Sequence, residues 1–257
     1  GTMGQWPAAA LQFRRGDVAP APVAVRQVVT SGDMFAFTGS GVVEGRNADF
    51  RMAEAPKAAE AGNDAGFDPL SYFAGRVERV ITDLPGAPAQ AKPLAVDLAK
   101  AIDRGAKTVT SLTGELRWDW GRGVVTVQTP RSQAVTGFLA RGGEMRLGDV
   151  AIKAGSEYGT VHVISLDGQP LAASRRILIQ AFTEEKMFGF RASGGRIEDT
   201  GRPPINVREI DASVTFARPV QAAVALDGHG YKAADLAVQG GATIALPKDR
   251  IYVIVTR

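Results

Sequence analysis

The sequence predicts an all-β protein whose main body is an antiparallel β-sandwich of jelly-roll-like character. Strand candidates follow one another at roughly 8–12 residues after Thr108, which is the spacing of sandwiches and barrels. Glycine is plentiful, with 30 residues in a chain of 257, and several glycines stand in plausible turns between these strands. Long helical patterns do not alternate with the strands, which argues against a parallel α/β sheet.

The clearest element is a β-hairpin within the stretch from Thr108 to Leu139. Apolar and polar residues alternate from Glu115 to Trp120, which is the period of a strand with one apolar face. The run Gly121-Arg122-Gly123 then predicts a turn, and the β-branched run from Val124 to Val127 predicts the second strand. Thr129-Pro130-Arg131 ends this strand, because proline cannot donate a hydrogen bond to a central ladder.

Further strands are expected along the rest of the chain, after polar residues that connect the hairpin to Phe138-Leu139. Turn sequences such as Asp167-Gly168 and Gly240-Gly241 separate several of them. The expected strands are Glu144 to Ile152, Gly159 to Leu166, Ile177 to Phe182, Val207 to Phe216, Ala222 to Leu226, Ala234 to Val238, Ala242 to Leu246 and Ile251 to Thr256.

The N-terminal part, residues 1–107, is expected to pack on the sandwich of residues 108–257 or to contribute edge strands to it. Its composition is rich in Pro and Ala in places and predicts short elements. These are a surface-hugging stretch over 5–22, strands over 23–29, 34–37 and 42–43, a short helix and loop over 53–66, a helix or a rival strand around Gly75-Arg76-Val77 within 68–81, a linker over 84–93 and a short helix over 97–106.

Composition and charge exclude several classes of function. A net charge of +3 without a dense basic block gives no reason to expect a nucleic-acid partner. No apolar run approaches the roughly 20 residues of a membrane span, so we expect no membrane partner. The absence of cysteine excludes disulfides, thiol catalysis and cysteine-bound zinc. Two histidines without a metal-binding spacing give no metal or cofactor site.

Trp118 and Trp120 are the most informative side chains for function. Residues two apart on a strand point to the same face, roughly 6.5–7 Å apart. That face is either core or an aromatic platform on which a sugar ring stacks. Burial favours the core for at least one of them. The carbohydrate interpretation adds Asp119 and Arg131 as candidate polar contacts.

Catalytic interpretations are weaker because neither histidine belongs to a recognisable catalytic pattern. His162 lies inside a predicted strand and His229 inside a glycine-rich turn, so ordinary structural roles are favoured. A hydrolase with paired carboxylates, or a lyase, needs a cleft with converging side chains. The one cluster that we can nominate is Asp119, Arg131, Glu115 and Tyr158.

Three stretches resemble the C-terminal β-sandwich region of bacterial secreted clan A-like glycoside hydrolases, including agarase-like and cellulase-like members. They are the hairpin from Ser111 to Ala134, the stretch from Ser165 to Leu178 and the tail from Gly201 to Val255, and the stretch Phe13 to Val18 fits the place where such chains leave a TIM barrel. Leu112 and Gln128 stand where the family pattern has Asp, and 188–197 lacks the expected Asn and Trp.

The resemblance implies a non-catalytic accessory domain that supports the catalytic TIM barrel of the same parent chain and contacts polysaccharide weakly. No catalytic residue carries over, because the family's catalytic glutamates lie on the barrel. An independent carbohydrate-binding protein and a free-standing β-scaffold glycosidase or polysaccharide lyase are the alternatives. The resemblance implies a secreted or periplasmic parent; Gly1-Thr2-Met3-Gly4 looks like a cloning remnant, so we expect the natural start to be missing.

Overall fold

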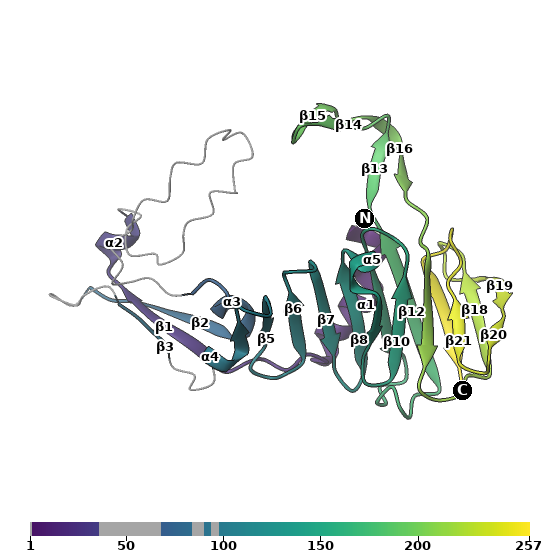
Figure 1. Cartoon of the computed structure of the whole chain (residues 1–257), viewed down its shortest axis with the longest axis horizontal. Helices are drawn as coiled ribbons and strands as arrows, with labels where there is room; N and C mark the ends of the chain where they lie inside the picture. The colour runs from purple at the N-terminus through teal and green to yellow at the C-terminus, as the bar shows by residue number, and fades with distance from the viewer. Residues whose placement is uncertain (1, 36–67, 84–89, 94–97) are drawn as a thin grey trace. The chain divides into compact units, whose positions relative to one another are not determined.

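The computed structural model describes residues 2–35, 68–83, 90–93 and 98–257, and it is mostly β (Figure 1). The chain divides into two compact units, which are described separately below. Residues 1–18 and 118–257 form the larger unit, and residues 19–117 form the smaller one. The structure therefore divides at 117/118 rather than at the expected 107/108, and the first 18 residues belong to the sandwich unit.

The larger unit is an antiparallel β-sandwich, as the sequence predicts. One sheet has the order β20-β21-β17-β10-β9, and the other runs β19-β18-β22-β12-β11-β8-β7-β6 within this unit. The strands are β6 (Leu116–Asp119), β7 (Val124–Gln128), β8 (Ser132–Gly137), β9 (Glu144–Arg146), β10 (Val150–Ala154), β11 (Gly159–Ser165), β12 (Arg176–Thr183), β17 (Ala212–Phe216), β18 (Ala222–Leu226), β19 (Lys232–Leu236), β20 (Val238–Gln239), β21 (Thr243–Ala245) and β22 (Tyr252–Thr256).

The main core lies between these two sheets. Alternate residues of the long central strand β12, including Ile177 and Ile179, face the other sheet, where they join Ile152, Val214 and Ile244. These side chains are fully buried. The intervening residues of β12 point to the opposite face of the sheet, so that face needs a cover of its own.

Helix α1 (Thr2–Arg15) covers the outer face of β11 and β12 in this unit. Its buried Ala8 packs with Ile164 and Leu178, and the Ala8 N–H donates to Oε1 of the buried Gln180 at 3.1 Å. The sequence predicts a surface-hugging stretch here rather than a helix. The helix is not predicted because Pro7 and the alanines obscure the helical spacing of its buried residues. That spacing is recognised only from the packing of the helix on the sheet.

A buried ion network joins the end of α1 to the sheet. Gly16 adopts φ +59°, and the Asp17 N–H donates to the Gln12 carbonyl, so the chain turns back at the helix end in a Schellman arrangement. This turn places the Asp17 carboxylate, which has no exposed surface, between two arginines: Arg15 Nη2 lies 2.5 Å from Oδ2 and Arg131 Nε lies 3.0 Å from Oδ1. The network ties α1 to the β7–β8 turn.

The same network reaches the β11–β12 connection. Arg15 Nη1 donates to the Ser165 carbonyl at 2.5 Å, Arg131 Nη2 donates to the Arg15 carbonyl at 3.2 Å, and the Ser165 N–H donates to the Arg131 carbonyl at 3.0 Å. Three segments that are distant in sequence therefore meet at one end of the sandwich.

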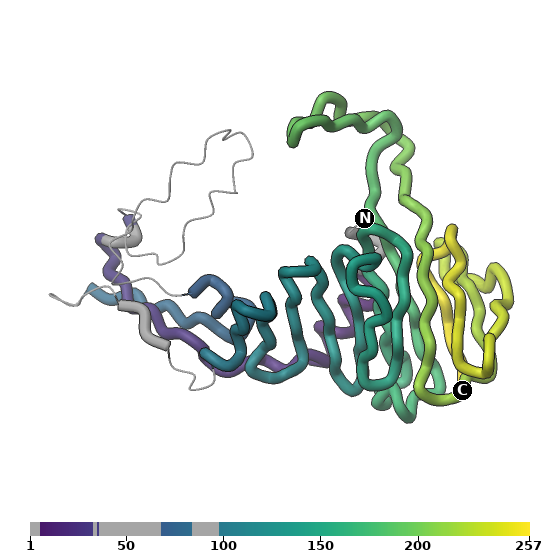
Figure 2. Tube along the Cα trace, in the orientation of Figure 1, coloured from purple at the N-terminus to yellow at the C-terminus, as the bar shows by residue number. Residues whose placement is uncertain are grey.

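A long β-ribbon, here called the arm (residues 184–207), extends from the end of β12 (Figure 2). Its base pairs β13 (Glu185–Phe188) with β16 (Arg202–Val207), and its outer part pairs β14 (Arg191–Ser193) with β15 (Arg196–Asp199). All residues of these four strands are exposed. Within this region only Val207 belongs to a strand that the sequence predicts, so the arm is a feature that the sequence pattern does not show.

The smaller unit contains a mixed three-stranded sheet of order β2-β1-β3. Strand β1 runs parallel to β2 and antiparallel to β3, so the parallel pair departs from the expected antiparallel pattern. The unit's elements are β1 (Val23–Val29), α2 (Ser31–Phe35), α3 (Ser71–Ala74), β2 (Arg76–Ile81), β3 (Gln90–Pro93), α4 (Leu98–Ala101), β4 (Ile102–Asp103) and β5 (Thr108–Thr110).

Several local predictions are confirmed and others need correction. The strands at Val23–Val29 and Ala222–Leu226 and the β6–β7 hairpin are confirmed. Both rival interpretations around Gly75 hold in part, because α3 precedes it and β2 follows it. The expected connection after Arg131 is strand β8, and the expected single strand over 144–152 is two strands.

Other corrections concern the N-terminal part. Met34 and Phe35 belong to α2 rather than to a strand, and the end of the expected linker is β3. The expected elements at 42–43 and 53–66 lie outside the described residues. Among the described residues, no helix combines the length and hydropathy that a membrane span requires.

Replacing the carboxylate of the ion network is expected to destabilise the larger unit. Asp17→Asn keeps the side-chain shape but leaves two arginines facing a neutral amide. Because Arg15 and Arg131 retain some solvent contact, we expect a loss of about 2–4 kcal/mol in the free energy of unfolding, measured by urea denaturation. Asp235→Asn is the matched control, because its 2.7 Å pair with Lys232 is largely exposed and worth less than about 0.5 kcal/mol. Equal losses in both variants would contradict a special role for Asp17.

Candidate functional site

The two tryptophans of the hairpin lie against each other and are both half-buried. Their ring centroids are 6.0 Å apart and their planes meet at 60°, an edge-to-face arrangement. Trp118 is part of β6, and Trp120 begins the turn that ends at Gly123. Neither indole belongs to the buried core, so the expectation that at least one of them is core is wrong. Because the planes are not parallel, a sugar ring can stack on one indole but not flat on both.

A second aromatic pair lies at the same end of the sheet. The Phe138 and Tyr158 rings are 5.5 Å apart at 72°, and the Arg141 guanidinium stands 4.3 Å from the centre of the Phe138 ring. The Phe138 N–H donates to the Gly123 carbonyl at 3.0 Å, which places this pair beside the turn of the tryptophan hairpin. We call the four rings Trp118, Trp120, Phe138 and Tyr158 the aromatic end.

The strand register explains why these residues meet. Gly137 of β8 pairs with Val124 of β7 and with Gly159 of β11. The residues next to these positions are therefore neighbours at one end of the sheet. They are Gly123, Phe138 and Tyr158. Phe138 and Arg141 are not predicted at the site from sequence, because strand β8, which supplies this register, is not predicted.

Asp119 and Arg131 are not brought together with each other. Asp119 is buried, and its carboxylate accepts hydrogen bonds from the Arg122 N–H at 2.9 Å and from Arg122 Nε at 2.7 Å. It therefore stabilises the hairpin turn, although the sequence pattern placed it on the polar face. Arg131 follows the other end of β7. Five residues of strand span roughly 16 Å, which separates Arg131 from the Asp119 end of the hairpin. Arg131 belongs to the Asp17 network instead.

The remaining members of the nominated catalytic cluster are also engaged elsewhere. Glu115 accepts a hydrogen bond from the Ala19 N–H at 2.7 Å within the smaller unit. Tyr158 packs on Phe138 at the aromatic end. Asp119, Arg131, Glu115 and Tyr158 therefore have separate structural partners, and this geometry gives the hydrolase or lyase interpretation no support.

Aspartates with depressed pKa values are turn-forming residues in this chain. Partial burial raises the pKa of Asp167, but hydrogen bonds from the Arg175 N–H, Ser174 Oγ, Ser165 Oγ and the Gln169 N–H outweigh it and hold the pKa well below its ordinary value. These bonds organise the β11–β12 connection. Depressed pKa values can mark functional sites, but here hydrogen bonding within a turn accounts for the shift.

The second such carboxylate is Asp227. The Tyr231 N–H, and after it the His229 N–H, hold the pKa of Asp227 below its ordinary value by donating to its carboxylate. His229 is an exposed residue of this β18–β19 turn, as expected from its glycine-rich surroundings. Within the described residues, no three His, Asp or Glu side chains are grouped closely enough to hold a metal ion.

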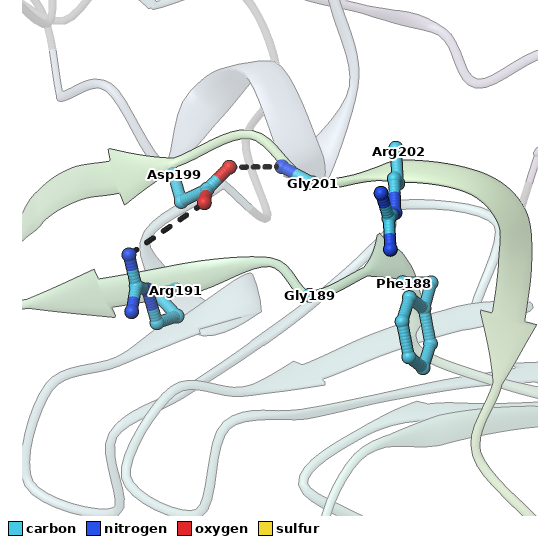
Figure 3. Close-up of a pocket in the computed structure, with 6 residues that line it drawn as sticks. All are labelled: Phe188, Gly189, Arg191, Asp199, Gly201 and Arg202. Atoms are coloured by element: carbon cyan, nitrogen blue, oxygen red, sulfur yellow. Dashed lines mark hydrogen bonds and ion pairs between the residues drawn. The ribbon is translucent and has the colours of Figure 1, made fainter.

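A shallow hollow of about 440 Å³ lies on the arm (Figure 3). Phe188 and two arginines, Arg191 and Arg202, line it together with Asp199 and two glycines. Asp199 accepts the Gly201 N–H at 2.8 Å, and its other oxygen lies 3.6 Å from Arg191. These contacts shape the bend of the arm between its two ribbons. The sequence does not predict this hollow, because its pattern does not reveal the four strands of the arm.

Comparison of the chain with protein-family models, with curated proteins and with solved structures finds no match. The geometry of the chain's own residues therefore has to support any proposal about its function.

His162 provides a test of pH dependence in the larger unit. Burial lowers its pKa from 6.5 to about 4, and its Nδ1 has no hydrogen-bond partner among the described residues. At a pH between these two pKa values, the unfolded chain binds a proton at His162 that the folded chain does not bind. Acidification from pH 6.5 to pH 4 should therefore remove stability, on the order of 3 kcal/mol, at this residue.

The measurement is urea denaturation across this pH range for the unsubstituted chain and for His162→Gln. The variant should show a flatter pH dependence, whereas His229→Gln, at an exposed turn, should keep the original one. Coinciding pH profiles for the unsubstituted chain and His162→Gln would contradict a lowered pKa of His162.

Proposed function

We propose that this chain is a non-catalytic accessory β-sandwich domain of a secreted polysaccharide-degrading glycoside hydrolase, and that it supports the catalytic domain of the same parent protein. The observation that carries this proposal is the outward face of α1. That face holds Trp6, Ala9, Ala10 and Phe13, which follow one another at helical spacing and are all exposed. Trp6 is 61% exposed and Phe13 is 88% exposed.

Helix α1 is apolar on both of its faces, which is unusual for a helix at the surface of a soluble domain. Its inward face, with Ala8 and Leu11, is used by the sandwich. Covering an exposed aromatic side chain contributes about 2 kcal/mol, so the outward face can supply substantial docking energy. The Asp17 network holds the helix firmly, so the face is presented in a fixed orientation.

The family resemblance is consistent with a neighbouring domain that covers the outward face of α1. The stretches around Asp17, Arg131 and Ser165 carry the resemblance, and they form one network at the end of α1. In the resembled enzymes the chain leaves a TIM barrel at the position of Phe13 to Val18. A catalytic barrel preceding α1 would cover the outward face that is exposed in this chain.

The proposal predicts that Phe13→Ser destabilises the intact gene product but not this chain. Removing the ring should cost about 1–2 kcal/mol where a neighbouring domain covers it and almost nothing where it faces water. Differential scanning fluorimetry of both proteins, with and without the substitution, measures this difference.

Tyr231→Ser is the matched control, because Tyr231 is equally prominent on the surface but lies in the β18–β19 turn. It should leave both melting temperatures unchanged. An unchanged melting temperature of the intact gene product with Phe13→Ser, or a gene product without a further domain, would overturn the proposal.

The aromatic end supports glycan binding as a second function. Trp118 and Trp120 are accessible in part, and Tyr158, which packs on Phe138, adds an exposed ring at the same end of the sheet. The edge-to-face geometry offers one stacking plane at a time, so weak binding of a single sugar unit is the expected outcome.

Titration of intrinsic fluorescence against agarose, cellulose, xylan, mannan, alginate and chitin oligosaccharides tests this function. We expect a saturable shift with one glycan and a loss of about tenfold in affinity in Trp120→Ala, the value of one lost stacking contact. Trp6→Ala is the matched control, because it removes the remaining tryptophan of the chain, on α1, and should leave the affinity unchanged. A flat response to every glycan would remove this second function.

A further inference from the structure

The aromatic end carries an arginine that no carboxylate of the described residues neutralises. Arg141 belongs to the short helix α5 (Leu139–Gly142), which follows β8 at that end of the sheet (Figure 1). Its guanidinium stands 4.3 Å from the centre of the Phe138 ring, and the residue is exposed. Within the described part of the chain, no Asp or Glu side chain lies within ion-pair distance of it. Its positive charge is therefore available to a ligand.

The other charges on the segments that carry the four rings are paired. These segments are residues 118–123, 138–142 and 156–158, and they hold three further charged side chains. Arg122 Nε lies 2.7 Å from Asp119 Oδ2, and Glu157 Oε2 lies 3.7 Å from Arg208 Nη1. Each of the two carboxylates thus has an arginine of its own. Arg141 is the charge that remains, so the electrostatic field at the aromatic end favours a negatively charged ligand.

The backbone holds Arg141 in a defined position. Leu139, two residues before it, is fully buried in the main core. The Ala140 N–H donates to the Ser156 carbonyl at 3.1 Å, and the Arg141 N–H donates to the Phe138 carbonyl at 3.0 Å. The ring of Phe138 adds a cation–π contact to the guanidinium. A cation that is already placed in this way loses little conformational freedom when a ligand binds.

Tyr158 supplies a stacking surface close to this cation. Its ring packs on Phe138 with the centroids 5.5 Å apart, and the residue is 46% exposed. Because Arg141 and Tyr158 contact the same ring, a short oligosaccharide that stacks on Tyr158 has the guanidinium within its reach. An aromatic face binds the apolar face of a sugar ring. The planar guanidinium binds a carboxylate through two parallel hydrogen bonds. A sugar that carries a carboxylate satisfies both groups.

We propose that the glycan bound at the aromatic end is a polyuronate, a polysaccharide whose sugar rings carry carboxylates, and that Arg141 selects it over neutral glycans. This inference rests on the proposed glycan binding, because it names the substrate class of that site. Nucleic acid is a poorer fit to a single unpaired arginine, since binding to a phosphate backbone uses several basic side chains together. The chain has a net charge of only +3.

Two pairs of oligosaccharides test the proposal, because the members of each pair differ only in the carboxylate. β-1,4-Linked oligomannuronate is compared with mannan oligosaccharide of the same length, and oligogalacturonate with its methyl ester. Calorimetric titration of this chain at about 10 mM salt should show the acidic member of a pair binding about fivefold more tightly than the neutral one. The difference should shrink at about 1 M salt, because salt screens an exposed charge.

Arg141→Gln should abolish both the preference for the acidic oligosaccharide and its salt dependence, while the affinity for the neutral one stays the same. Arg176→Gln is the matched control, because it removes the same charge from an exposed arginine at the far end of β12. The near end of that strand, Thr183, is the one that pairs with Gly159 beside Tyr158. The control should keep the preference. Circular dichroism should show equal strand content in both variants, because both positions are exposed.

The outcomes separate this inference from the glycan binding on which it rests. A neutral glycan that binds as tightly as its acidic counterpart, or cellulose or xylan binding without either uronate, would overturn the inference and leave glycan binding in place. An acidic preference that survives Arg141→Gln, or that Arg176→Gln removes equally, would overturn it as well. A chain that binds no glycan, acidic or neutral, would overturn both.

Discussion

The contact on which the sandwich unit depends is the buried carboxylate of Asp17 between Arg15 and Arg131. A carboxylate without solvent is unfavourable unless charges and hydrogen bonds compensate it, so Arg131 must meet the end of α1, where Arg15 and Asp17 lie. Arg15 in turn binds the Ser165 carbonyl, which brings in a third segment. Their meeting fixes the end of α1 over β11 and β12, the β7–β8 turn and the β11–β12 connection in one arrangement. Gly16 makes this possible, because a residue at φ +59° turns the chain back under its own helix.

That arrangement determines which surfaces the protein offers to others. With its inward face used by Ile164 and Leu178, α1 presents Trp6 and Phe13 to the outside in a fixed orientation. The β8 register then places Phe138 and Tyr158 beside the tryptophan hairpin. The arm leaves from β12, whose residues after Arg176 are all buried, so the arm is attached to a well-packed strand. The outward face of α1 and the aromatic end are therefore two separate exposed surfaces of one unit.

Local structural contacts account for several of the titratable residues of this unit, without a functional role. Asp167 and Asp119 are held by hydrogen bonds within turns, and Arg131 is held by Asp17. His162 is neutral because burial disfavours its charge. These residue types attract attention in a sequence because catalysis uses them, but here each has a local partner or a buried position that accounts for it. The aromatic rings and apolar faces are the features that lack such an explanation.

The sequence alone determined the β class, the hairpin of Trp118 and Trp120, and most strands of the sandwich, because alternation, β-branched runs and glycine turns are local signals. It did not determine α1, whose helical character depends on the sheet that covers one of its faces. Nor did it determine strand β8 or the arm, because their polar and proline-containing residues resemble loops until the cross-strand register is known. Only the tertiary structure decided that Asp119 and Arg131 lie at opposite ends of β7 and that Phe138 joins the aromatic end. The physical reason is that long-range pairing, not local pattern, decides which residues become neighbours.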